Sequence, residues 1–169
     1  LSFESILRAT KDAQSGAIDA IVTAPICKES FLLAGLNFTG HTTLLKSLTG
    51  SKNVSMGFFT EKLKTVLATV HIPLIDVPKA ITKDCLDDAF ENTLLFSRLL
   101  SIKSPKIAVA ALNPHASEQG MFGHEEQTLL NPAIERWTKK GLSFIGPVPA
   151  DTLYHRAYQG DFDLVVSLY

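Results

Sequence analysis

The sequence has few cysteines, and this scarcity limits where the protein can work. Cys27 and Cys85 are the two cysteines among 169 residues, and neither belongs to a CxxC pair or a Cys/His cluster. Disulfide-stabilised secreted domains and structural zinc fingers need closely grouped cysteines. Two isolated cysteines therefore predict free thiols in a reducing compartment, and we expect a cytoplasmic protein.

Long apolar runs and clusters of positive charge are absent as well. The apolar runs fall far short of the roughly 18 residues that a membrane-spanning helix needs. The net charge is −1 and the basic residues are dispersed, which excludes an electrostatic binder of nucleic acids or membrane surfaces. The chain opens at Leu1 without the features of a signal peptide. Because it lacks an initiator methionine, we expect a segment of a longer protein.

Several catalytic signatures are missing too. The sequence contains no G-x-S-x-G or Ser-His-Asp arrangement, no GxGxxG fingerprint and no P-loop. Its composition, 46% hydrophobic and 20% charged, is that of an ordinary globular domain with a sizeable core. Function therefore has to be inferred from residues outside these motifs.

What the sequence does contain is an alternation of helical and strand patterns. Helical patterns cover residues 2–15, 28–34, 42–48, 84–100, 126–139 and 151–158. Strand patterns cover residues 18–24, 54–59, 64–70, 106–112, 143–145 and 162–169. Apolar strands separated by helices predict an α/β domain with a mixed sheet flanked by helices. No repeat or clear linker divides residues 1–169. Ser101–Pro105 is the best candidate for a boundary, but we do not expect a domain break there.

Two histidines follow strand patterns at the point where each strand ends. His71 comes after residues 64–70, and His115 comes after residues 106–112 in the segment NPHASEQGMFGHEE. Ligands of open α/β sheets bind beyond the carboxyl ends of the strands. Two imidazoles there could share one rim and bind Zn, Co, Ni or Fe. Two interpretations stay open at this point: metal ligands, or hydrogen-bonded histidines in turns.

The segment Gly40-His41-Thr42 directly precedes an apolar helical pattern. The start of a helix offers free N–H groups and a positive dipole end to a phosphate or carboxylate. Thr42 could instead cap the helix. Lys28 is either a cation for the same anion or a solvated lysine.

Three further polar residues have simpler interpretations. We expect His124 and Asp151 to cap helices and His155 to lie on the surface.

Together these segments resemble one enzyme family. They are VTAPICK, GHT, VHIPLIDVPKAIT, ALNPHASEQGMFGHEE and GPVPADTLY, in this order, and the likeness runs through nearly all of the chain. They are similar to the 4-hydroxythreonine-4-phosphate dehydrogenase family of pyridoxal phosphate (vitamin B6) biosynthesis, which has the isocitrate/isopropylmalate dehydrogenase-like fold. The resemblance implies that residues 1–169 are the central α/β portion of a larger two-domain dehydrogenase, incomplete at both ends.

The resemblance also implies a metal site and a substrate site. It identifies His71 and His115 as metal ligands, with a third histidine directly after Tyr169, and His41 and Thr42 as substrate-binding residues. A divalent metal (Zn, Mg or Co) and NAD or NADP would be the cofactors. The third histidine would come from the partner subunit of a homodimer. The nucleotide-binding residues stay unassigned, as does any catalytic residue beyond the metal site.

The implied reaction is the oxidation and decarboxylation of 4-phosphohydroxy-L-threonine to 3-amino-2-oxopropyl phosphate. The chain departs from the family pattern at Cys27 (usually Asn), at Thr43 (usually Glu) and at Ser117–Gly120 (usually Gly-Glu-Gly-Gly). These departures spare the metal pair but leave open another phosphorylated hydroxy-acid as substrate. Two further interpretations stay open, a metal-dependent hydrolase and a catalytically silent fragment. We expect the 169-residue chain alone to be inactive.

Overall fold

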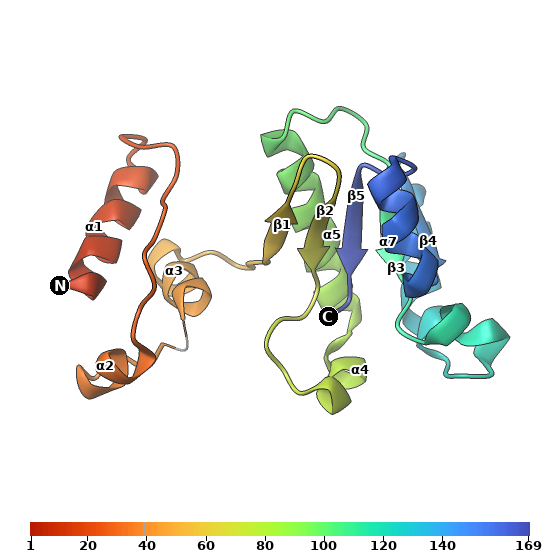
Figure 1. Cartoon of the computed structure of the whole chain (residues 1–169), viewed down its shortest axis with the longest axis horizontal. Coiled ribbons are helices and arrows are strands. Elements are labelled where there is room, and N and C mark those ends of the chain that lie inside the picture. The colour runs from red at the N-terminus through yellow and green to blue at the C-terminus, as the bar shows by residue number, and fades with distance from the viewer. Residues whose placement is uncertain (39) are drawn as a thin grey trace. The chain divides into compact units, whose positions relative to one another are not determined.

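The computed structural model describes residues 1–38 and 40–169, which form two compact units, Leu1–Val54 and Ser55–Tyr169 (Figure 1). Each unit has a hydrophobic core of its own. The sequence patterns indicated no domain boundary near residue 54. Their best candidate for a boundary, Ser101–Pro105, lies inside the second unit. The prediction that the chain is the central part of a two-domain enzyme stays a prediction.

The first unit contains three helices: α1 (Ser2–Gln14), α2 (Lys28–Leu33) and α3 (His41–Thr49). Ile6, Phe31 and Leu44 contribute one buried side chain from each helix. The Phe3 and Phe31 rings meet edge to face, 6.4 Å apart. All three helices were predicted, because their apolar residues recur at helical spacing.

The strand predicted at residues 18–24 is wrong. These residues are irregular and largely exposed, and Val22 is 97% exposed. A strand is stable only when its backbone pairs with a neighbouring strand. The described part of the first unit contains no strand that could supply this pairing. The apolar pattern alone was therefore insufficient.

The second unit is built on a five-stranded sheet with the order β1-β2-β5-β3-β4. The strands are β1 (Gly57–Phe59), β2 (Lys64–Leu67), β3 (Ile107–Ala110), β4 (Phe144–Val148) and β5 (Leu164–Ser167). The first pair is antiparallel and all other pairs are parallel. The carboxyl ends of β2, β5, β3 and β4 therefore lie at the same edge of the sheet.

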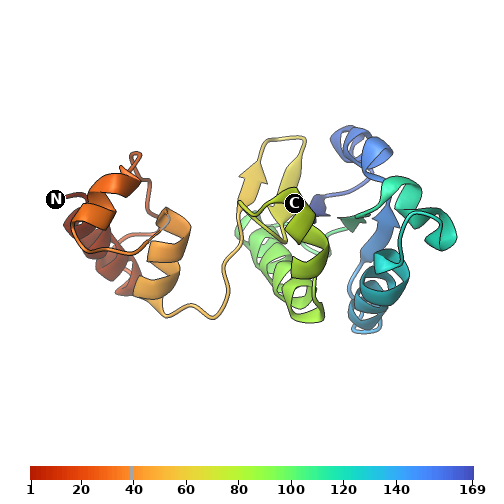
Figure 2. The same ribbon diagram turned by 90° about the horizontal axis from the view of Figure 1, so that it is seen from below.

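Helices cover both faces of this sheet, which is why its strands are apolar on both sides (Figure 2). The helices are α5 (Lys83–Leu99), α6 (Asn131–Thr138) and α7 (Ala150–Gln159). Ile107 and Val109 of β3 pack in the core formed with α5 and α6. Ala108 and Ala110 pack against α7 on the opposite face. The predicted mixed sheet flanked by helices is confirmed.

Short helical segments complete the second unit and lie at or near the carboxyl edge. They are η1 (Leu74–Asp76), α4 (Val77–Ala80), η2 (Pro114–Gly120) and the π-helical η3 (Glu126–Leu130). No helix in the described ranges is both long and apolar enough to cross a membrane.

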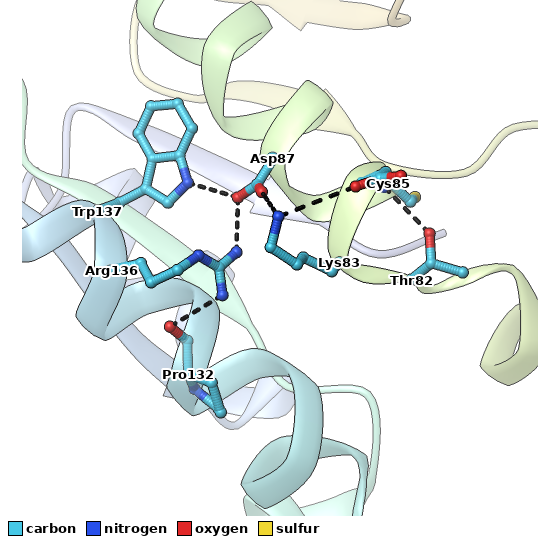
Figure 3. A network of polar contacts seen from close by, with 8 residues as sticks. Thr82, Lys83, Cys85, Asp87, Pro132, Arg136 and Trp137 are labelled. Carbon is cyan, nitrogen blue, oxygen red and sulfur yellow. Dashed lines mark hydrogen bonds and ion pairs between the residues drawn. The ribbon is translucent and has the colours of Figure 1, made fainter.

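A polar network joins α5 to α6 beside the aromatic core (Figure 3). The Asp87 carboxylate accepts hydrogen bonds from Trp137 Nε1 and an Arg136 guanidinium nitrogen, both at 2.7 Å. Phe90 stacks on Phe144 at a centroid distance of 4.3 Å and meets the Trp137 ring edge to face. These contacts fix the two helices on one face of the sheet.

Candidate metal and substrate site

The order of the strands places the two predicted metal ligands on either side of β5. Val66 of β2 and Val109 of β3 both pair with Val166 of β5, so the three strands are in register. His71 follows β2 and His115 follows β3, while Tyr169 lies just past the end of β5. The sequence predicted both strands but extended them to residues 70 and 112, whereas β2 ends at Leu67 and β3 at Ala110. The parallel pairing brings their carboxyl ends to one edge.

Pairing between β2 and β5 continues almost to His71. Thr69 donates its backbone N–H and its Oγ1 hydrogen to the Leu168 carbonyl, at 3.1 and 2.6 Å. His71 therefore leaves the sheet beside Tyr169. Tyr169 lines a cavity of about 340 Å³ together with His71, and a second cavity of about 390 Å³ together with His115.

Both histidines have an unusual backbone conformation. His71 has φ 51° and His115 has φ 52°, in the left-handed region that non-glycine residues rarely adopt. His115 begins a run of five left-handed residues that ends at Gln119. Both side chains are exposed, and neither imidazole makes a hydrogen bond within the described chain. This geometry argues against histidines whose rings serve to hold their own turns.

The loop carrying His115 folds back against the start of η3. Asn113 Nδ2 donates to Glu125 Oε2 and to Glu126 Oε2, both at 2.8 Å. The backbone N–H of Glu125 and the Asn113 amide lower the pKa of the Glu125 carboxyl. Gly123 permits this approach, because a Cβ there would lie 2.6 Å from both Asn113 Nδ2 and Glu125 Oε2. Sequence patterns gave no sign of these contacts.

Asp151 has a different position in its helix from the one predicted. Helix α7 begins at Ala150 after Pro149, so Asp151 lies inside the first turn and makes no capping hydrogen bond. The prediction of a capping role is wrong because the helix starts one residue earlier than the pattern indicated. Asp151 and Tyr154 instead line the cavity that contains His115.

The predicted substrate-binding residues, His41 and Thr42, are the first two residues of α3 in the first unit. Thr42 does not cap the helix; Thr43 Oγ1 donates to the Gly40 carbonyl at 3.1 Å instead. His41 Nε2 is buried and has no hydrogen-bond partner among the described residues. His41 Nε2 thus lacks the partner that a buried polar atom usually has.

The remaining candidate residues give less evidence of a functional role. Lys28 is exposed at the start of α2, after Cys27, whose pKa is lowered mainly by a hydrogen bond from the Ser30 side chain. His155 is exposed, as predicted. The His124 carbonyl accepts the Thr128 backbone N–H at 2.9 Å, and the capping role expected for its side chain stays a prediction. Its ring packs beside Gly120.

A complete set of metal ligands is not found in the described residues. They contain no group of three or more His, Cys, Asp and Glu side chains able to hold a metal ion. His71 and His115 offer two imidazoles at one sheet edge, and this donor type suits zinc or cobalt. The third histidine predicted after Tyr169 lies outside this sequence and stays a prediction.

The sequence matches the family described as pyridoxal phosphate biosynthetic protein PdxA over residues 1–169. The chain belongs to the PdxA family. The resemblance noted from the sequence segments is thereby confirmed, and the PdxA match includes both units and all four candidate histidine and threonine positions.

Known members of the PdxA family include enzymes with two different names. A D-threonate 4-phosphate dehydrogenase of Pectobacterium atrosepticum is 39% identical over 169 residues, which are 100% of this chain and 52% of that protein. A 4-hydroxythreonine-4-phosphate dehydrogenase of Geobacter metallireducens is 40% identical over 167 residues, 99% of this chain and 49% of the relative. The chain thus spans about half the length of these relatives.

The fold agrees with that of solved PdxA-family structures. The crystal structure of 4-hydroxythreonine-4-phosphate dehydrogenase from Klebsiella pneumoniae superposes with a TM-score of 0.96 at 40% identity. The match covers 100% of this chain and 51% of the Klebsiella chain. The named relatives and the Klebsiella protein are dehydrogenases by name.

Proposed function

We propose that the full-length protein is a metal- and NAD(P)-dependent dehydrogenase of a phosphorylated hydroxy-acid. The observation that carries this proposal is the placement of His71 and His115 on either side of β5, beside cavities that share Tyr169. Both imidazoles are exposed and free of hydrogen bonds in the described chain, which suits metal ligands. The names of the PdxA relatives support the dehydrogenase class.

His71 and His115 would hold a divalent metal, Zn, Co or Mg. When bound, such an ion acts as a Lewis acid that lowers the pKa of a substrate hydroxyl. Both residues have a left-handed backbone and lie a few residues beyond the end of their strand. A third ligand from a partner subunit would complete the site, so the active form would be a homodimer. We expect the 169-residue chain alone to lack activity, since it supplies two ligands.

The first unit would contribute to substrate binding. His41 and Thr42 stand at the start of α3, where unpaired N–H groups favour an anion such as a phosphate. The buried and unpartnered His41 Nε2 supports this role, because a buried polar atom usually has a partner. The Thr42 hydroxyl is not used in capping and would be free to contact the same ligand.

Our first candidate substrate is 4-phosphohydroxy-L-threonine. Its C3 would transfer a hydride to NAD or NADP while the 3-hydroxyl loses its proton to solvent, and the resulting β-keto acid would lose its carboxylate as CO2. The product would be 3-amino-2-oxopropyl phosphate, a precursor of pyridoxal phosphate. This candidate follows the family description and the names of relatives such as the Geobacter enzyme.

A second candidate is D-threonate 4-phosphate, which is named for relatives of Pectobacterium atrosepticum and Salmonella typhimurium at 39% and 40% identity. The two compounds share the carboxylate, the 3-hydroxyl and the 4-phosphate and differ at C2, which bears an amino group or a hydroxyl. The same metal and the same hydride transfer would serve both. The protein group that contacts C2 therefore decides which of the two compounds is the substrate.

Activity measurements on the full-length protein test both candidates. Each compound would be supplied with NAD+ or NADP+ and with Zn2+, Co2+ or Mg2+, and the reduced nucleotide followed by its absorbance. We expect turnover of one compound to exceed that of the other at equal concentration. Absence of nucleotide reduction with either compound and every metal would overturn the dehydrogenase proposal.

Cytoplasmic location is proposed as well, on the basis of the two free cysteines.

A further inference from the structure

Glu126 is the one buried charged side chain in the part of the chain that the structure describes, and it is 1% exposed. A carboxylate is stable in such a position only when its oxygens accept hydrogen bonds. Glu126 begins η3, directly after the loop that carries His115. The partners of its two oxygens therefore matter for the position of that loop.

Both carboxylate oxygens of Glu126 accept hydrogen bonds from Leu112 and Asn113, the second and third residues after the end of β3. Oε1 accepts the backbone N–H groups of Leu112, at 2.8 Å, and of Asn113, at 2.7 Å. Oε2 accepts a hydrogen from the Asn113 side-chain amide at 2.8 Å. Three donors thus converge on one side chain, and all three belong to the link between β3 and His115.

This link determines where His115 leaves the sheet. The Ala111 N–H donates to the Val148 carbonyl at 2.9 Å, which is the last sheet-like bond along this segment. Pro114 has no N–H, so Asn113 is the last residue before His115 whose backbone N–H can be anchored. The His115 ring lies 6.4 Å from the Phe122 ring, between centroids, and no hydrogen bond of its own is described. The backbone that Glu126 holds therefore contributes to the position of His115.

We propose that Glu126 is a positioning residue that fixes His115 for metal binding, acting through the backbone of Leu112 and Asn113. This inference rests on the proposed function. The buried carboxylate acts without becoming a ligand. Glutamine cannot replace it, because an amide has one acceptor oxygen and would direct its N–H2 group at another donor. The loop would then shift, and His115 with it.

The test uses Co2+ as a probe of the full-length protein. We expect Glu126→Gln to weaken Co2+ binding about tenfold or more and to change the visible spectrum of the bound ion, as loss of a supporting hydrogen bond does around other metal ligands. Asp87→Asn is the matched control. It also removes a carboxylate that accepts three donors, but between α5 and α6. It should lower stability and leave Co2+ affinity and spectrum unchanged.

A second variant keeps the proposal testable if Glu126→Gln does not fold. Asn113→Ala removes only the amide bonds and keeps the two backbone bonds to Glu126, so we expect a smaller loss of affinity. Wild-type Co2+ affinity and spectrum in whichever of these variants folds would overturn the positioning role. In the same titration His115→Ala must weaken binding. If it does not, the metal site itself is wrong, and this outcome differs from a failure of the positioning role of Glu126 alone.

Discussion

The indole Nε1 of Trp137 donates a 2.7 Å hydrogen bond to Asp87 Oδ1, and this contact joins α6 to α5. Arg136 donates to the same oxygen, and Lys83 Nζ lies 3.2 Å from Oδ2. Partial burial raises the pKa of the Asp87 carboxyl, but these donors outweigh it and hold the pKa below its ordinary value. A carboxyl with a lowered pKa stabilises the fold above its unfolded pKa, and that contribution is lost as the pH falls through the folded pKa.

We therefore predict that Asp87→Asn lowers the free energy of unfolding at pH 7 by about 1–3 kcal/mol, the range for hydrogen bonds to a charged group. The deficit relative to wild type should be the same at pH 7 and pH 5. It should shrink below about pH 4, because the wild-type carboxyl then becomes protonated. Urea unfolding at pH 7, 5 and 3 measures this. A deficit that does not change with pH would refute the charged role of Asp87.

Ser117 provides a second prediction, because two unfavourable features coincide there. Its φ is 65°, and its buried Oγ has no hydrogen-bond partner among the described residues. A left-handed non-glycine residue costs about 1–2 kcal/mol, and an unsatisfied buried hydroxyl costs about 1–3 kcal/mol. We expect Ser117→Ala to stabilise the protein by about 1 kcal/mol and Ser117→Gly to stabilise it further.

Ser101 is the matched control for this pair. It is exposed and also left-handed, with φ 57°, so Ser101→Gly relieves only the backbone. Its stabilisation should stay below that of Ser117→Gly. Urea unfolding compares the three variants. A loss of stability in Ser117→Ala would mean that the hydroxyl has a partner in solution, such as a water molecule.

The third prediction separates binding from stability at the start of α3. Thr42→Val removes a hydroxyl that caps nothing, so the free energy of unfolding should change by less than about 0.5 kcal/mol. The Michaelis constant for the phosphorylated substrate should rise, if Thr42 contacts it. Thr43→Val is the control, because it removes the bond to the Gly40 carbonyl and should cost about 0.5–1.5 kcal/mol. The opposite pattern would show that Thr42 is structural.

The sequence predicted that β2 and β3 are strands and that His71 and His115 lie beyond them, because a strand depends on a local apolar run, although it placed each strand end two or three residues too late. It did not predict that β5 lies between them, since strand order depends on pairing between distant segments. The role of Glu126 was hidden for the same reason. A glutamate at a helix start is typical of any helix, and its contacts with Leu112 and Asn113 exist only after folding.

The irregular segment at residues 18–24 shows the converse limit. Its apolar residues satisfy the strand pattern, but the described chain offers no neighbour for its backbone. Periodicity indicates which residues would face a core, and it does not tell whether the pairing partner is present. The cavity beside His115 is a similar case, because Asp151 and Tyr154 reach it through the packing of α7 on the sheet.

The last prediction concerns the metal pair. His71→Ala and His115→Ala should each weaken Zn2+ binding by the full-length protein at least about tenfold, since each removes a ligand that contributes more than a supporting contact. His155→Ala is the matched control: it removes an exposed imidazole on α7 and should bind Zn2+ like the wild type. Calorimetric titration of the three variants measures the effect. Equal losses in all three would indicate nonspecific binding to surface histidines. Wild-type affinity in both His71→Ala and His115→Ala would remove the two residues from the metal site.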